Sequence, residues 1–143
     1  MAAHDARAIA RAFAPRHPLG NRWDYCYVLS KLRSDPLYPG VLEALRGSQA
    51  PLLDMGCGLG LLAHALRHDG QRQPYRGVDN DAAKIRRADG VAHRAGLAAS
   101  RFEVMDLATT LPEHRGSVAI LDVLQYLPAE AQSALLRRAA AML

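Results

Sequence analysis

The chain lacks the features that mark secreted, membrane-spanning or zinc-binding proteins. Its 143 residues include only two cysteines, Cys26 and Cys57, which are too few for a disulfide framework. No Cys-x-x-Cys pair or Cys/His cluster is present, so no metal site is expected. No apolar run reaches the ~18 residues of a transmembrane helix, and Asp5 interrupts the start of the chain, unlike a secretory signal peptide. We therefore expect a cytoplasmic protein with no membrane span.

Lysine is scarce as well, and arginine supplies most of the basic charge. The formal net charge is +4, with 18 Lys and Arg against 14 Asp and Glu. A basic balance is one sign of nucleic-acid binding. Here the arginines are scattered, and no run is longer than the pairs Arg86-Arg87 and Arg137-Arg138. The pattern favours a solvated surface, so nucleic acid is not an expected partner. The length fits a single domain.

The most informative segment present is an apolar strand that runs into a glycine-rich turn. It reads Leu52-Leu53-Asp54-Met55-Gly56-Cys57-Gly58-Leu59-Gly60, and a helical spacing of apolar residues follows. Glycine adopts positive φ and lets a ligand approach the backbone. The N–H groups at the start of the following helix then point at that ligand. The segment predicts a strand, a binding turn and a helix.

A second strand ends in an acidic residue 19 positions after Gly60, in Tyr75-Arg76-Gly77-Val78-Asp79. A carboxylate about 20 residues past such glycines is positioned to accept hydrogen bonds from ribose hydroxyls. A dinucleotide site would require a third glycine where Leu61 stands. Asp54 would also repel a pyrophosphate, whereas it suits a cationic ligand. The two segments therefore predict a site for a ribose-bearing ligand with positive charge.

At this point the chain resembles the class I S-adenosylmethionine-dependent methyltransferases. Their first motif, D/E-x-G-x-G-x-G, is matched from Asp54 to Gly60, and their second by Asp79. Two looser segments resemble later motifs, around Asp106 for the adenine and from Ile120 to Pro128 after the fourth strand. The resemblance covers Pro51 to Leu143. It implies that S-adenosylmethionine binds at Asp54, Gly56, Cys57, Gly58, Gly60, Asp79, Asn80, Met105, Asp106, Leu107 and Asp122.

Helices and strands alternate along most of the chain. Helices are expected at 5–14, 23–32, 41–45, 59–68, 81–95 and 129–143, and strands at 51–55, 74–79, 101–105 and 117–121. This alternation predicts an α/β fold with a Rossmann-like, doubly wound parallel sheet. The expected strand order is 3-2-1-4, after a set of N-terminal helices. Four acids, Asp54, Asp79, Asp106 and Asp122, then lie at the carboxyl ends of strands, where ligands bind.

We expect residues 1–48 to form a helical segment that covers the substrate and residues 49–143 to form the cofactor-binding domain. The fourth strand is unbroken and apolar from Val118 to Leu121, which is typical of a strand buried on both faces. Members of the resembled class continue with further strands. We therefore expect the domain to be an N-terminal portion of a longer one, or a second copy of the chain to cover this strand.

Several polar residues have a structural interpretation as well. Asp81 is expected to cap the following helix, and Cys57 to be a small turn residue. His64 and His68 lie four residues apart, a spacing that suits metal ligands, but without a third ligand we expect partly exposed helix residues. The aromatic residues Trp23, Tyr25, Tyr27 and Tyr38 are candidates for the core or for the substrate pocket.

The resemblance implies in-line methyl transfer to a small organic or lipid-like acceptor. Methylation of a nucleobase amine is not expected, because Asp122-Val123-Leu124-Gln125 stands where that type carries Asn/Asp-Pro-Pro-Tyr/Phe. No residue identifies itself as a general base, and the candidates by position are Asp122, Tyr126, Lys31 and Tyr25. A nicotinamide-dependent oxidoreductase and a non-catalytic nucleoside-binding module are the alternatives.

Overall fold

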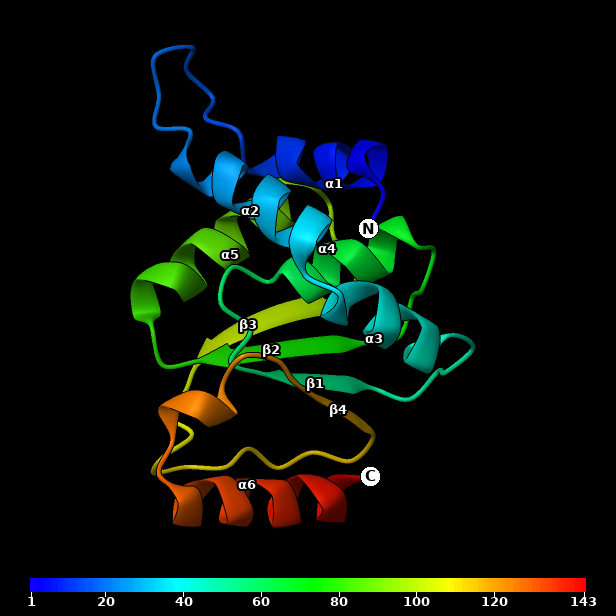
Figure 1. Cartoon of the computed structure of the whole chain (residues 1–143), viewed down its shortest axis with the longest axis vertical. Helices are drawn as coiled ribbons and strands as arrows, with labels where there is room; N and C mark the ends of the chain where they lie inside the picture. The colour runs from blue at the N-terminus through cyan, green and yellow to red at the C-terminus, as the bar shows by residue number, and fades with distance from the viewer.

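Four parallel strands form the sheet at the centre of the fold. The computed structural model describes residues 1–143, and the strands stand in the order β3-β2-β1-β4 (Figure 1). Their bounds are Leu52–Met55 for β1, Tyr75–Asp79 for β2, Ser100–Val104 for β3 and Ser117–Ile120 for β4. The predicted Rossmann-like sheet and its strand order are confirmed. All four carboxyl ends lie at the same side of the sheet.

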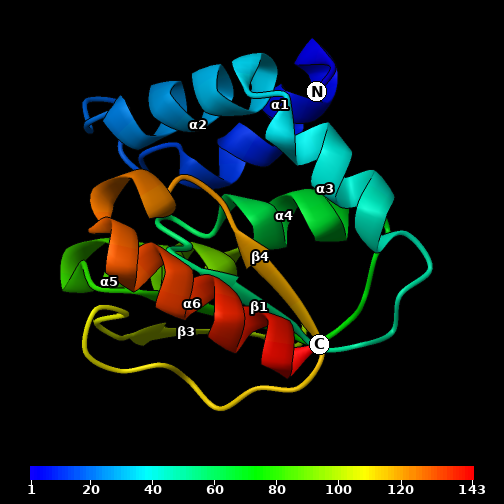
Figure 2. The ribbon, with the colours of Figure 1, turned by 60° about the horizontal axis from the view of Figure 1, so that its bottom comes forward.

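Helices cover both faces of the sheet, as a doubly wound fold requires. The helices α1 to α5 lie on one face and α6 lies on the other (Figures 1 and 2). Their bounds are Ala3–Ala10, Trp23–Ser34, Leu37–Leu45, Leu61–His68, Ala82–Arg94 and Ala129–Met142. Two short 3-10 turns, η1 at Arg11–Phe13 and η2 at Leu124–Tyr126, complete the set. None of the helices combines the length and apolar character needed to cross a bilayer.

The start of α5 follows from its capping residue. The Asp81 side chain accepts hydrogen bonds from the backbone N–H groups of Ala83 at 3.0 Å and Lys84 at 3.1 Å. These groups would otherwise lack partners in the first turn of the helix. The same hydrogen bonds lower the pKa of the Asp81 carboxyl. The predicted N-cap is therefore confirmed, and it fixes where the chain turns after β2.

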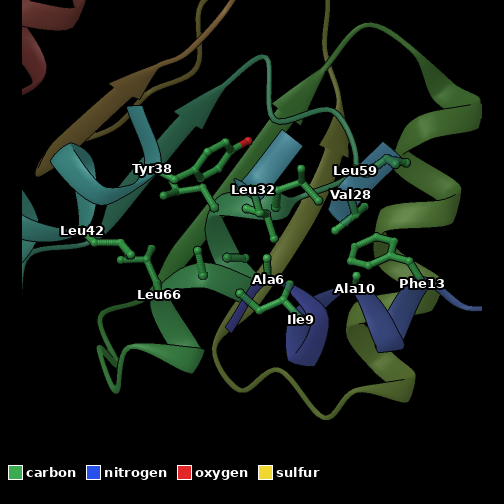
Figure 3. Packing of buried hydrophobic residues seen from close by; sticks show 14 of the residues in the cluster. Ala6, Ile9, Ala10, Phe13, Val28, Leu32, Tyr38, Leu42, Leu59 and Leu66 are labelled. Atoms are coloured by element: carbon green, nitrogen blue, oxygen red, sulfur yellow. The ribbon is translucent and has the colours of Figure 1, made fainter. Parts of the chain in front are cut away.

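Two hydrophobic cores lie on opposite sides of the sheet. The larger core joins α1 to α3 with α4, and Figure 3 shows Ile9, Phe13 and Leu32 converging on it. The smaller core joins the sheet to α6 through Leu53 and Leu135, among others. Side chains alternate along β1, so neighbouring residues serve different cores. Each fully buried leucine contributes about 1.5–3 kcal/mol, so both helical layers are firmly attached.

Both faces of β4 contact a hydrophobic core, Ala119 on one side and Val118 and Ile120 on the other, but the strand is only partly buried in this chain. Only Ala119 is buried in this strand, while Ser117, Val118 and Ile120 are partly exposed. The strand pairs with β1 along one edge and has no partner along the other. The exposure therefore lies along the unpaired edge, and its covering by a further strand or a second copy stays a prediction.

His64 is also more buried than expected. Its side chain lies in the larger core with a relative exposure of 4%, and its ring stands 4.9 Å from that of Phe13. The helix α1 packs on α4 at this point, a contact between distant parts of the chain that local spacing does not reveal. His68, one turn later, is partly exposed as expected and lies 2.8 Å from Asp5.

Candidate functional site

A cavity of about 470 Å³ opens at the carboxyl ends of the strands. Its volume falls in the range of small-molecule pockets. The four strand-end acids, Asp54, Asp79, Asp106 and Asp122, all line it, so their predicted convergence is confirmed. Ten of the eleven residues predicted to bind the cofactor line this cavity, and only Gly60 does not.

The three glycines of the turn differ in what requires them. A Cβ on Gly56 would collide with the side chain of Val123, and one on Gly60 would stand 2.5 Å from Phe102. Both positions are therefore needed for packing within the protein. Gly58 has a φ of +54° and no atom within 4 Å of the place where its Cβ would be. Gly58 is the glycine that leaves open space for a ligand beside the backbone.

Asp54 is a buried carboxylate that faces the cavity. Its relative exposure is 3%, and the hydroxyl of Tyr75 donates a hydrogen bond of 2.6 Å to its Oδ2. The other oxygen accepts no hydrogen bond from the protein. Burial raises the pKa of Asp54 from 3.8 to about 6, the Tyr75 hydrogen bond lowers it, and the nearby Asp79 charge raises it. A cationic ligand group would relieve this cost by compensating the buried charge.

Asp79 is oriented by the backbone before any ligand arrives. Its Oδ2 accepts the N–H of Gly58 at 2.9 Å, and its Oδ1 accepts the N–H of Asp81 at 2.9 Å. A carboxylate has about four acceptor positions, so two remain for hydroxyl groups of a ligand. The side chain thus joins the glycine turn of β1 to the end of β2 and presents free acceptors to the cavity.

Asp106 and its neighbours form the wall after β3. The Asp106 side chain accepts the N–H of Ala108 at 2.9 Å, which holds the loop in a local turn. The N–H of Met105 donates to the carbonyl oxygen of Asp79 at 2.8 Å, so the two strand ends are joined. Met105 and Leu107 add apolar surface on either side of the Asp106 carboxylate. This combination suits a flat aromatic ring with a polar edge.

Cys57 has a structural environment rather than a reactive one. It is buried, and its Sγ would lie 2.8 Å from a Cβ on Gly77. Burial raises the pKa of the Cys57 thiol, with smaller contributions from the Asp54 and Asp79 charges. Because the thiolate is the nucleophilic form, the geometry agrees with a turn residue.

Lys31 of α2 crosses to the end of β4 and closes one side of the cavity. Its Nζ lies 2.6 Å from Asp122 and 2.8 Å from Asp35. The hydrogen bond to Asp122 and that to Asp35 raise the pKa of Lys31. Both ion pairs favour the protonated form of Lys31, which is not the form that a general base requires. Asp122 has a φ of +56°, an uncommon value for a residue other than glycine, and such strain concentrates at functional sites.

Two of the four N-terminal aromatic residues reach the cavity. Tyr27 and Tyr38 line it, whereas Trp23 and Tyr25 do not. Tyr25 instead lies under the guanidinium of Arg22, 4.8 Å from the ring centre, so its role as a base is not supported. Tyr126 lines the mouth and is 80% exposed.

Tyr75 and Lys84 are parts of the site that the sequence interpretation missed. Tyr75 orients Asp54, and Lys84 lines the cavity from the first turn of α5. Alternation along β2 places Tyr75 and Asp79 on the same face, which is the sequence signal that would have found Tyr75. No group of three His, Cys, Asp or Glu side chains is arranged to hold a metal ion.

The fold and the cavity define a class of protein, a Rossmann-like domain with a glycine turn and strand-end acids around its ligand site. Residues 52–143 match the family described as a methyltransferase domain, and the chain belongs to this family. No curated protein sequence matches the chain.

Solved structures with the same fold include known methyltransferases. One is an S-adenosylmethionine-dependent methyltransferase of Clostridium acetobutylicum, with a TM-score of 0.66 and 16% identity over 82% of this chain and 51% of that one. Another is the magnesium protoporphyrin IX methyltransferase of Synechocystis with bound S-adenosylhomocysteine. It has a TM-score of 0.64 and 20% identity, over 92% of this chain and 59% of that one.

A third similar structure belongs to echinomycin biosynthesis and is described as converting a disulfide bond into a thioacetal group. It shares 31% identity over 73% of this chain and 44% of that one, with a TM-score of 0.57. The chain thus spans about half the length of these three structures.

Proposed function

We propose that the protein is an S-adenosylmethionine-dependent methyltransferase that acts on a small organic or lipid-like acceptor. The observation that carries the proposal is the convergence of Asp54, Asp79 and Asp106 on one cavity beside the open backbone at Gly58. The family to which the chain belongs supports the same reaction class.

Gly58 and three of the acids that line the cavity each have a complementary part in this cofactor. Gly58 supplies the space in which the ligand lies against the backbone. Asp79 accepts from the ribose hydroxyls, Asp106 faces the adenine, and Asp54 offsets positive charge on the methionine part. When bound, the cofactor supplies a methyl group on a sulfonium, which needs no further activation. The main task of the protein is to orient the acceptor and exclude water.

The acceptor would approach from the side of α2 and η2. Tyr27, Tyr38 and Leu127 form an aromatic and apolar wall there, which suits an organic acceptor with apolar surface. In-line transfer requires a general base only where the acceptor is a hydroxyl or a protonated amine. Asp122 and Tyr126 line the cavity and stay candidates for that role. A cytoplasmic location stays a prediction.

The two alternatives make different demands on the site. A nicotinamide dinucleotide would bring its pyrophosphate to the glycine turn, beside the buried and ionisable Asp54. That charge opposes dinucleotide binding. A non-catalytic module would bind the same cofactor as a methyltransferase but would yield no methylated product.

Calorimetric titration with S-adenosylhomocysteine and with NAD tests the proposal. We expect micromolar binding of the first ligand and none of the second. Tight NAD binding would contradict the assignment. Incubation with methyl-labelled S-adenosylmethionine and a mixture of small-molecule extracts then separates enzyme from module, since only an enzyme transfers label to an extracted product.

A further inference from the structure

We propose that the loop before α2 docks the protein on an anionic lipid surface. The docking surface consists of Arg16, Leu19, Arg22 and Trp23, and we call it the basic tip. Figure 1 shows residues 14–22 projecting from the layer of α1 and α2, at the opposite end of the molecule from α6. This inference goes beyond methyl transfer and does not depend on it.

The apolar part of the basic tip has no role in the core. Leu19 is 90% exposed, the largest value for any leucine in the chain. Trp23, the only tryptophan, is 71% exposed. Tyr27, one helical turn after Trp23, is also exposed, with 46% of its surface accessible. Residues four apart share one face of a helix, so Trp23 and Tyr27 lie on the same face of α2. Large apolar side chains exposed this close together in the chain mark a candidate interaction surface.

The loop holds Leu19 outward by local hydrogen bonds. The N–H of Gly20 donates to the carbonyl oxygen of His17 at 2.9 Å, which closes a tight turn around Leu19. The N–H of Leu19 itself donates to the His17 ring at 3.2 Å. The side chain of Asn21 accepts the N–H of Trp23 at 2.9 Å, which fixes the start of α2. The exposed side chains are thus presented by an ordered turn.

From Arg7 to Arg22 the only charged side chains are arginines. No acidic residue occurs between Asp5 and Asp24, while four arginines do. None of these four arginines forms a salt bridge, and Arg22 only stacks on Tyr25. Asp24, the nearest acid along the chain, is paired with Arg87 at 3.0 Å. An anionic partner would therefore meet unpaired positive charge.

The combination of groups favours a lipid surface over a nucleic acid. Arginine and tryptophan occur in both kinds of interface, but a projecting leucine at the tip has no base or phosphate to contact. In a bilayer, leucine enters the acyl region, tryptophan lies at the headgroup level, and arginine binds the phosphates. Leu19, Trp23 and the two arginines supply one group for each of these layers.

The basic tip adjoins the cavity along α2. Trp23 is part of the basic tip, and Tyr27, one helical turn further along α2, lines the cavity. Docking would bring the mouth of the cavity close to the lipid surface. A short route for a lipid-like acceptor would follow, and this consequence alone rests on the proposed function.

Because Trp23 is the only tryptophan, its fluorescence reports docking directly. Vesicles of mixed phosphatidylglycerol and phosphatidylcholine should shift its emission to shorter wavelength, brominated lipids should quench it, and salt should reverse both effects. Pure phosphatidylcholine should have a much weaker effect. Emission that does not respond to the anionic vesicles would overturn the proposal.

Matched variants locate the surface. Each arginine near an anionic bilayer is worth about fivefold in binding, so the double variant Arg16→Gln/Arg22→Gln should bind about thirtyfold more weakly. Leu19→Ser should weaken binding about tenfold or more. All three side chains are exposed, so folding is not at risk.

The control uses equivalent exposed residues on α6, with Leu136→Ser and Arg137→Gln/Arg138→Gln, which should bind like the parent chain. Equal losses in the tip and α6 variants would show non-specific adsorption and overturn the proposal. A single-stranded oligonucleotide that binds more tightly than the vesicles through Arg16 and Arg22 would also overturn it, in favour of a nucleic-acid surface.

Discussion

Protonation of Asp54 should weaken the binding of S-adenosylhomocysteine as the pH falls from 7 to 5. The carboxyl is buried, and its pKa is raised to about 6. The ammonium group of the ligand is expected to pair with the ionised form. Binding then requires loss of the proton below pH 6, so the dissociation constant should rise about tenfold between pH 7 and pH 5. Calorimetry across this range measures the effect.

The variant Asp54→Asn separates charge from shape. Its side-chain oxygen still accepts the Tyr75 hydroxyl, but it carries no charge at any pH. We expect weaker binding at pH 7 and no change in affinity between pH 5 and pH 7. A parent chain with affinity independent of pH, or a variant with the same pH dependence as the parent, would refute the reasoning.

The same carboxyl has an opposite effect on folding. Its pKa is raised from 3.8 to about 6 in the folded chain, so the folded state prefers the protonated form. Stability from this group is therefore largest below pH 4 and falls as the pH rises through 6. One pKa unit corresponds to about 1.4 kcal/mol, so ionisation costs about 3 kcal/mol. The site retains a charge that the fold alone would disfavour, as expected of a binding residue.

Three further changes test other parts of the account. Gly58→Val should abolish cofactor binding, whereas Gly47→Val, equally strained at φ +82° but away from the cavity, should not; binding by both would refute the open-backbone role. Asp79→Ala should weaken binding by about 1.5–3 kcal/mol by calorimetry. His64 has a pKa lowered to about 4 by burial, so its stability contribution is lost as the pH falls from 6.5 through 4. Urea unfolding at pH 7 and pH 4.5 should show a smaller loss of unfolding free energy for His64→Leu than for the parent chain.

The positions of the four acids at strand ends could be predicted because each follows an apolar strand in the local sequence, whereas the strand order is expected from the alternating fold and the family resemblance. Asp54 and Asp79 end apolar strands, and parallel strands bring their carboxyl ends together. Asp81 followed from the chemistry of helix caps, which involves only the next three residues. The strand-end acids and the helix cap need no knowledge of which distant segments touch.

The remaining features depend on contacts between segments far apart in the chain. Lys31 pairs with Asp122 across 91 residues, and this ion pair favours its protonated form. Gly56 is needed because Val123 packs on it, and Gly60 because Phe102 does. Such contacts leave no mark in local spacing or composition. The sequence pattern predicts cofactor binding for all three glycines, whereas in the structure Gly56 and Gly60 serve packing and Gly58 leaves the space for a ligand.

The central claim, that the glycine turn and the strand-end acids bind the cofactor, is tested most directly by amide chemical shifts. Addition of S-adenosylhomocysteine to the labelled protein should move the backbone N–H signals of Gly58, Asp79 and Asp106 and leave those of α6 unchanged. Saturable shifts confined to this cavity would agree with the account. No shifts at these residues, or shifts clustered at another surface, would contradict it.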